Sequence, residues 1–137
     1  MQEYNIEDIA TAETQNIMVS VCRELLDTDT AHNKLWGYYL RIENNSADSI
    51  TLTGKNLYIT DNLGQSRCDI SAGFHGEIPN LEPGEYFEFE DMTDIKADTA
   101  VLYGFCKAVS KSGTEFHIAL PPIQLSADLD SRPKIYH

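Results

Sequence analysis

Residues 36–43 read Trp-Gly-Tyr-Tyr-Leu-Arg-Ile-Glu, and this stretch decides the fold class. A large apolar residue occupies every second position from Trp36 to Ile42. Successive residues of a strand point to opposite faces of a sheet, so a period of two predicts a strand with one apolar face. We expect that face in a core formed by Trp36, Tyr38, Leu40, Ile42, Phe105 and Ile118.

Short stretches of the same kind recur along the chain, and turn residues separate them. Residues 61–64 (Asp-Asn-Leu-Gly), 83–84 (Pro-Gly) and 111–113 (Lys-Ser-Gly) read as turns. Residues 100–109 are apolar on both faces, a pattern typical of a central strand that is covered on both sides. About seven strands at near-regular spacing, with no long helical pattern between them, predict an all-β antiparallel sandwich.

We expect the sandwich to span residues 17–125. Residues 1–16 form an N-terminal extension, for which the expectation is a short helix capped by Asn5 or a disordered segment. Residues 126–137 form a polar C-terminal tail that we expect to fray.

The charge of the chain excludes several classes of partner. The net charge is −12, from 22 Asp and Glu against 10 Lys and Arg. Such a surface repels phosphate backbones and anionic lipids, so we expect no nucleic acid and no membrane among the partners. No run of about 18 apolar residues is present, and the first residues lack the pattern of a signal peptide, so the expected location is cytoplasmic.

Two groups of residues have a structural and a functional interpretation. Cys22, Cys68 and Cys106 are odd in number and widely spaced, and each lies in a strand-like stretch, where a free cysteine is usually a small buried hydrophobe. Residues 82–98 contain seven acids and the single base Lys96. This run is a solvated face, a docking patch for a basic partner or a loose cation site.

Five short motifs, in order, give the chain a resemblance to the ApaG domain family. Residues 38–44 are similar to the family's YxxxIEN strand, and residues 57–64 are similar to its ITDxxG hairpin. Residues 73–87 are similar to its GxxGexPxLxPGexF pattern, and residues 120–125 are similar to its closing IPPFxL. Where the family loop often reads GxGxxG, Ser71 stands at the first glycine position. The motifs are Val19-Ser20-Val21, residues 38–44 (Tyr-Tyr-Leu-Arg-Ile-Glu-Asn), residues 57–64 (Leu-Tyr-Ile-Thr-Asp-Asn-Leu-Gly), residues 73–87 and residues 120–125 (Leu-Pro-Pro-Ile-Gln-Leu).

The resemblance implies an immunoglobulin- or fibronectin III-like β-sandwich. Members of the family occur as small bacterial proteins and as domains attached to eukaryotic F-box and polymerase-associated proteins, where they are thought to bind partners. Bacterial members have been linked loosely to cobalt and magnesium handling.

The residues give little support to catalysis or to a cofactor. A dinucleotide fingerprint needs a strand, a loop and a helix, whereas the glycines at 73 and 76 lie between two strands and beside acids. For a metal site, the candidate groups are Asp27, Asp29 and His32, His75 with Glu77, and His117 with Glu115, none at a recognised ligand spacing. We therefore expect no cofactor, no resident metal and no catalytic residue, and an enzyme is the less favoured interpretation.

A non-catalytic protein-binding module remains, with the loop of Gly73, Phe74, His75, Gly76 and Glu77 as its binding loop. An aromatic ring between two flexible glycines resembles an interface anchor, although Phe74 could instead fold back and cap the core. The partner would be a protein or a peptide, and an unpaired sandwich edge also suits a homodimer. The alternative function is a weak nucleotide-binding protein or metal-dependent phosphohydrolase that acts through the same loop.

Overall fold

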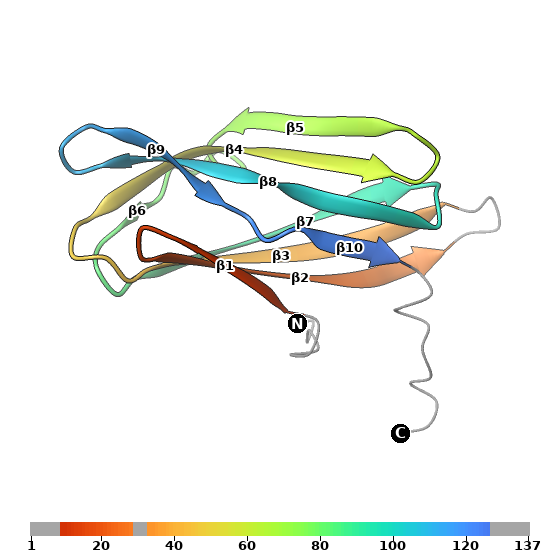
Figure 1. Ribbon diagram of the computed structural model, residues 1–137, viewed down its shortest axis with the longest axis horizontal. Helices are drawn as coiled ribbons and strands as arrows, with labels where there is room; N and C mark the ends of the chain where they lie inside the picture. The colour runs from red at the N-terminus through yellow and green to blue at the C-terminus, as the bar shows by residue number, and fades with distance from the viewer. Residues whose placement is uncertain (1–8, 29–32, 127–137) are drawn as a thin grey trace, which may run out of the picture.

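The structure, a computed structural model, describes residues 9–28 and 33–126, and it is an all-β sandwich of two antiparallel sheets (Figure 1). Sheet A has the strand order β1-β2-β3-β7, and sheet B has the order β10-β8-β4-β5, with β6 paired to β4 and β9 paired to β8. The predicted fold class is confirmed. The strands are β1 (Ala10–Thr14), β2 (Ile17–Thr28), β3 (Lys34–Asn44), β4 (Ile50–Asp61), β5 (Ser66–Ala72), β6 (Asn80–Leu81), β7 (Tyr86–Ile95), β8 (Thr99–Ser110), β9 (Glu115–Ala119) and β10 (Ile123–Ser126).

The core lies between the two sheets and follows the alternation of the strands. Trp36, Tyr38, Leu40 and Ile42 on β3 are buried as predicted, and so is Ile118 on β9. Phe105 is only partly buried because the register of β8 places it on the outer face of sheet B, where its ring stacks on His117 at 4.1 Å. The expectation that Phe105 belongs to the core is therefore wrong.

Turns and a bulge set the register. Gly64, Gly84 and Gly113 all have positive φ in the three predicted turns. Between Leu52 and Gly54 the pairing of β4 with β8 shifts, and this β-bulge changes which residues of β4 point inward. The bulge directs the side chain of Lys55 into the sandwich, where it is buried.

The ends of the chain differ in part from the expectation. Residues 10–14, expected in a helix or a disordered extension, form β1 and pair with β2 because Thr14 to Ile17 make a tight turn between them. Asn5 and the rest of the expected helix before residue 9, like the tail after residue 126, lie outside the described residues. No helix in the described ranges is long and apolar enough to cross a membrane.

One side of the sandwich is closed and the other side is open. On one side, β10 of sheet B lies beside β2 of sheet A, and Arg23 Nε donates a hydrogen bond to the Gln124 carbonyl oxygen at 2.7 Å. On the other side, β5 ends sheet B and β7 ends sheet A, and in the described residues each pairs with one strand only. This second side holds the candidate site.

Candidate functional site

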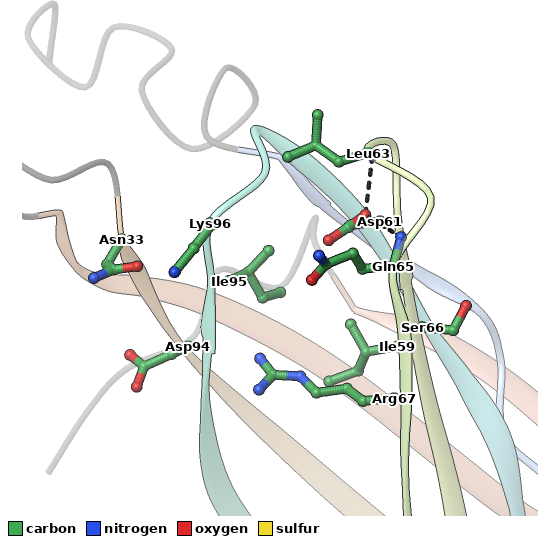
Figure 2. Close-up of a pocket in the computed structure, with 10 residues that line it drawn as sticks. All are labelled: Asn33, Ile59, Asp61, Leu63, Gln65, Ser66, Arg67, Asp94, Ile95 and Lys96. Carbon is green, nitrogen blue, oxygen red and sulfur yellow. Dashed lines mark hydrogen bonds between the residues drawn. The ribbon is translucent and has the colours of Figure 1, made fainter.

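A cleft runs between the edge strands β5 and β7. It consists of two chambers of about 300 Å³ and about 130 Å³, and Ile59 and Arg67 line both. The larger chamber lies toward the β4–β5 hairpin, and the smaller one reaches Asp69 and Asp91 (Figure 2 shows the larger). Because the chambers share two lining residues, they adjoin each other along the open side of the sandwich.

Polar side chains from both sheets meet at the hairpin end of the cleft. Arg67 extends from β5 toward β7 (Figure 2). Its Nη2 donates a hydrogen bond to Thr93 Oγ1 at 2.9 Å. Asp94 and Lys96 follow on the β7 side. The Asp61 carboxylate is already used, because its Oδ1 accepts the backbone N–H groups of residues 63 and 65 at 2.9 Å each and so holds the hairpin turn.

Two carboxylates and a phenol form the other end. Asp69 stands on β5 and Asp91 on β7, while Tyr38 lies beneath them on β3. Burial raises the pKa of Tyr38 well above its ordinary range, and the negative charges of Asp91 and Asp69 raise it further. The Tyr38 hydroxyl therefore stays protonated and can donate a hydrogen bond at physiological pH.

A buried ammonium group lies behind this end of the cleft. Lys55 Nζ is 3.8 Å from Asp69 Oδ2, and it lies over the rings of Phe89 and Phe74 at 4.9 and 5.3 Å from their centroids. Positive charge is attracted to the faces of aromatic rings, so the rings and the carboxylate together offset the cost of burying the ammonium group. Burial also raises the pKa of the neighbouring Cys106 thiol to about 12, with Lys55 opposing the shift, so Cys106 is not a thiolate nucleophile.

The predicted binding loop, residues 73–77, is a tight turn rather than a flexible segment. Phe74 N donates to the Glu77 carbonyl at 2.7 Å, and Glu77 N donates to the Phe74 carbonyl at 3.1 Å. His75 and Gly76 lie between them with φ of 52° and 88°, which is the positive-φ pattern of a two-residue hairpin turn. A Cβ on Gly73 would lie 2.5 Å from the Glu77 carbonyl oxygen, so the turn requires glycine there. The glycines thus serve the turn and are not hinges.

Phe74 is a core residue. Its side chain is 0% exposed and packs edge-on against Phe87 and Phe89 of β7, with centroid distances of 5.3 and 5.4 Å. The expectation that its ring is exposed as an interface anchor is wrong, and the alternative, in which it folds back to cap the core, describes the structure. The ring joins the loop to sheet A at the end of the cleft.

His75 and Glu77 remain on the surface of this loop. His75 Nε2 lies 3.2 Å from Asp91 Oδ2, and its ring packs on Phe89 at 4.7 Å. Glu77 and Gly76 are exposed. The structure therefore brings His75 to the cleft residue Asp91, while Glu77 is not among the residues that line the cleft.

The site offers hydrogen-bond donors and acceptors above an apolar floor. Arg67 donates, Asp69 and Asp91 accept, and Leu57 and Ile59 form the floor. In the described part of the chain, no three side chains of His, Cys, Asp or Glu gather in a way that could hold a metal ion. Of the sequence candidates for metal ligation, Asp29 and His32 lie outside the described residues.

Sequence reasoning missed most of the cleft. The sequence does not indicate that Arg67, Thr93 and Asp91 lie close together. Their strands, β5 and β7, belong to different sheets and are separated along the chain by the loop and β6. The available signal was the alternation in residues 66–70 (Ser-Arg-Cys-Asp-Ile), which places Arg67 and Asp69 on one face of a strand.

Comparisons with known proteins agree with this fold. The family model described as ApaG domain matches residues 26–110. The chain is 29% identical over 117 residues to Protein ApaG of Rhodospirillum centenum, covering 83% of this chain and 90% of that one. It is 28% identical over 120 residues to Protein ApaG of Methylocella silvestris, covering 85% and 92%.

Solved structures give the same picture. An X-ray structure of a structural genomics target superposes with a TM-score of 0.78 at 26% identity, covering 84% of this chain and 89% of that one. The putative ApaA protein from Bordetella pertussis superposes with a TM-score of 0.77 at 22% identity, covering 80% and 92%, and that likeness concerns the fold alone.

Proposed function

The chain belongs to the ApaG domain family, and from this premise we propose that it is a non-catalytic protein-binding module that takes an extended segment of a partner at the cleft between β5 and β7. The observation that carries the proposal is the cleft itself, two adjoining chambers with apolar floor residues and with donors and acceptors on both walls. The backbone of a peptide has N–H groups that need acceptors and C=O groups that need donors. Walls that offer both hydrogen-bond donors and acceptors can therefore bind a peptide.

The edge strands support this mode of binding. Each of β5 and β7 pairs on one side only in the described residues, so each presents a row of backbone groups along the cleft. An extended segment that pairs with such an edge gains backbone hydrogen bonds, while pockets for alternate side chains give selectivity. The two chambers of the cleft would supply those pockets.

The charged side chains of the cleft indicate which charges the bound segment should carry. Arg67 and Lys96 are the bases that line it, and Asp69, Asp91 and Asp94 are acids that do so. A segment with charges of both signs meets complementary groups there, since both acids and bases line the chambers. The loop of residues 73–77 contributes His75, which lies beside Asp91 at one end.

Nucleotide chemistry at the loop has no comparable support. The N–H groups of Phe74 and Glu77 are donated within the turn, so they are not free to bind a phosphate. We therefore retain the binding module as the proposed function.

The test is a selection of displayed linear peptides on the immobilised protein, followed by affinity measurements with two matched variants. Arg67→Glu reverses the charge in the middle of the cleft and should weaken binding of the selected peptides by about tenfold or more. Arg41→Glu makes the same change on the outer face of sheet A, where Arg41 lies over the Tyr86 ring, and should leave the affinity unchanged.

The proposal fails if the selected peptides bind Arg67→Glu as tightly as the unaltered protein. It also fails if Arg41→Glu weakens them equally, because the peptides would then bind outside the cleft or respond only to net charge. Melting temperatures of both variants, measured alongside, separate a loss of binding from a loss of fold.

A further inference from the structure

The outer face of sheet B presents several apolar side chains that none of the described residues covers. The outward positions of β8 include Val101, Tyr103 and Phe105, and Ile70 of β5 lies in the same row as Phe105, with Asn56 of β4 between them. Tyr103 and Ile70 are 38% and 58% exposed. The Tyr103 ring stacks on the Tyr58 ring of β4, with their centroids 5.4 Å apart. The sequence pattern of a strand covered on both sides is thus present, but in the described residues only the inner side is covered.

Charge is distributed unequally between the two outer faces. By strand alternation, the outward positions of sheet B carry one carboxylate, Glu115, together with the bases Lys107 and His117. The outward positions of sheet A carry the single base Arg41 and many carboxylates. These include Glu13, Glu24, Asp27, Glu43, Glu88, Glu90 and Asp94.

The face of sheet B also contains a recess. A hollow of about 320 Å³ lies between β5 and β9, and its lining includes Ile70, Lys107, Glu115 and His117. A surface that pairs with itself about a two-fold axis must contain both the projecting and the receiving parts. Here Tyr103 and Ile70 project, and the hollow beside Ile70 can receive a side chain.

We propose that the outer face of sheet B is the interface through which two copies of this chain associate. With a net charge of −12, two copies repel each other across most of their surfaces. The face of sheet B carries one carboxylate, Glu115, beside the bases Lys107 and His117, so two copies meet there with little repulsion between carboxylates. Burial of its aromatic and aliphatic side chains supplies the attraction. This interface differs from the edge pairing expected from the sequence, and it does not depend on the peptide cleft.

Analytical ultracentrifugation of the full chain from micromolar to millimolar concentration tests the proposal. We expect a reversible monomer–dimer equilibrium that Ile70→Glu weakens by about tenfold or more, because it places a carboxylate opposite an apolar surface. The matched control is Ile78→Glu, since Ile78 is also 58% exposed but lies in the segment between the loop and β6. It should leave the equilibrium unchanged within about twofold.

A second pair of variants keeps the test valid if Ile70→Glu does not fold. Tyr103→Glu should also weaken the dimer, whereas Tyr86→Glu, at an exposed tyrosine of sheet A, should not. A chain that stays monomeric throughout this concentration range contradicts the proposal and would leave the face to a different protein. A dimer that resists both Ile70→Glu and Tyr103→Glu contradicts the assignment of the face.

Salt provides an independent readout. Because the copies carry like charge and the interface is apolar, sodium chloride should tighten the dimer by screening the repulsion. An interface built from opposite charges, such as sheet A of one copy against the bases of another, would weaken with salt. Weakening with salt therefore contradicts the proposed interface.

Discussion

Lys55 Nζ lies 3.8 Å from Asp69 Oδ2, and the two side chains differ sharply in exposure, at 3% for Lys55 and 51% for Asp69. The ammonium group belongs to the core, and the carboxylate belongs to the wall of the cleft. A substitution on one side of this pair therefore has a different consequence from a substitution on the other.

We predict that Asp69→Asn lowers the free energy of unfolding more than Lys55→Met does. Loss of the carboxylate removes a negative charge that offsets the cost of burying the ammonium group. The expected loss of stability is about 1–3 kcal/mol, which lies between the values typical of exposed and of buried ion pairs. Lys55→Met keeps an unbranched chain between the rings and leaves a carboxylate that water can reach. Urea denaturation of both variants measures the difference, and a larger loss for Lys55→Met would refute this account of the pair.

The second prediction concerns Phe74. Phe74→Ala should lower the free energy of unfolding by about 3–5 kcal/mol, because it opens a cavity against Phe87 and Phe89. Phe74→Leu should cost less because leucine refills part of the space. His75→Ala, at the exposed neighbour, serves as the control and should cost no more than about 1 kcal/mol. Equal and small losses for Phe74→Ala and His75→Ala would show that the ring does not belong to the core.

Stability should fall at alkaline pH. The folded-state pKa values of Tyr38 and Cys106 are raised above the unfolded values, 10.0 and 9.0, by burial first of all. Groups with raised pKa values stabilise the fold below their unfolded pKa, and this contribution is lost as the pH rises. The free energy of unfolding should therefore decline from about pH 9 upward.

Tyr38→Phe should make this decline shallower above pH 10.0, because the variant has no phenol to ionise on unfolding. Tyr86→Phe removes an exposed tyrosine and serves as the control. Denaturation at a series of pH values measures the slopes. A slope for Tyr38→Phe equal to that of the unaltered protein would contradict the burial of the Tyr38 hydroxyl.

The three cysteines should differ in reactivity. The expectation that each is buried holds for Cys22 and Cys106 but is wrong for Cys68, which is exposed because its position on the edge strand β5 points outward. A thiol reagent should therefore modify one cysteine of the native protein quickly, and all three after denaturation. Rapid modification of a Cys68→Ser variant in its native state would contradict the burial of the other two.

Much of the fold could be predicted from local patterns. The alternation of residues 36–43 identified the inward side of β3, and the glycines at 64, 84 and 113 marked three turns that require positive φ. Both patterns depend only on residues that are neighbours in the sequence, so they can be recognised without knowledge of the tertiary structure.

The remaining features depend on contacts that the sequence does not encode locally. Phe105 lies in a strand that is apolar on both faces, so alternation alone does not tell which face is the core. Lys55 points inward because of the bulge at residues 52–54, and a one-residue shift exchanges the two faces of a strand. Arg67 and Thr93 meet because β5 and β7 end two different sheets on the same side, which follows from the topology.

The most direct test of the cleft as a binding site is a nuclear magnetic resonance titration of the labelled protein with a selected peptide. The account predicts that the largest shifts of backbone amide signals fall on residues 66–72 of β5 and 86–95 of β7, with smaller shifts in residues 73–77. The outer faces of both sheets should change little. Shifts confined to strands β1 and β2 of sheet A, or to β8 and β9 of sheet B, would contradict the central claim.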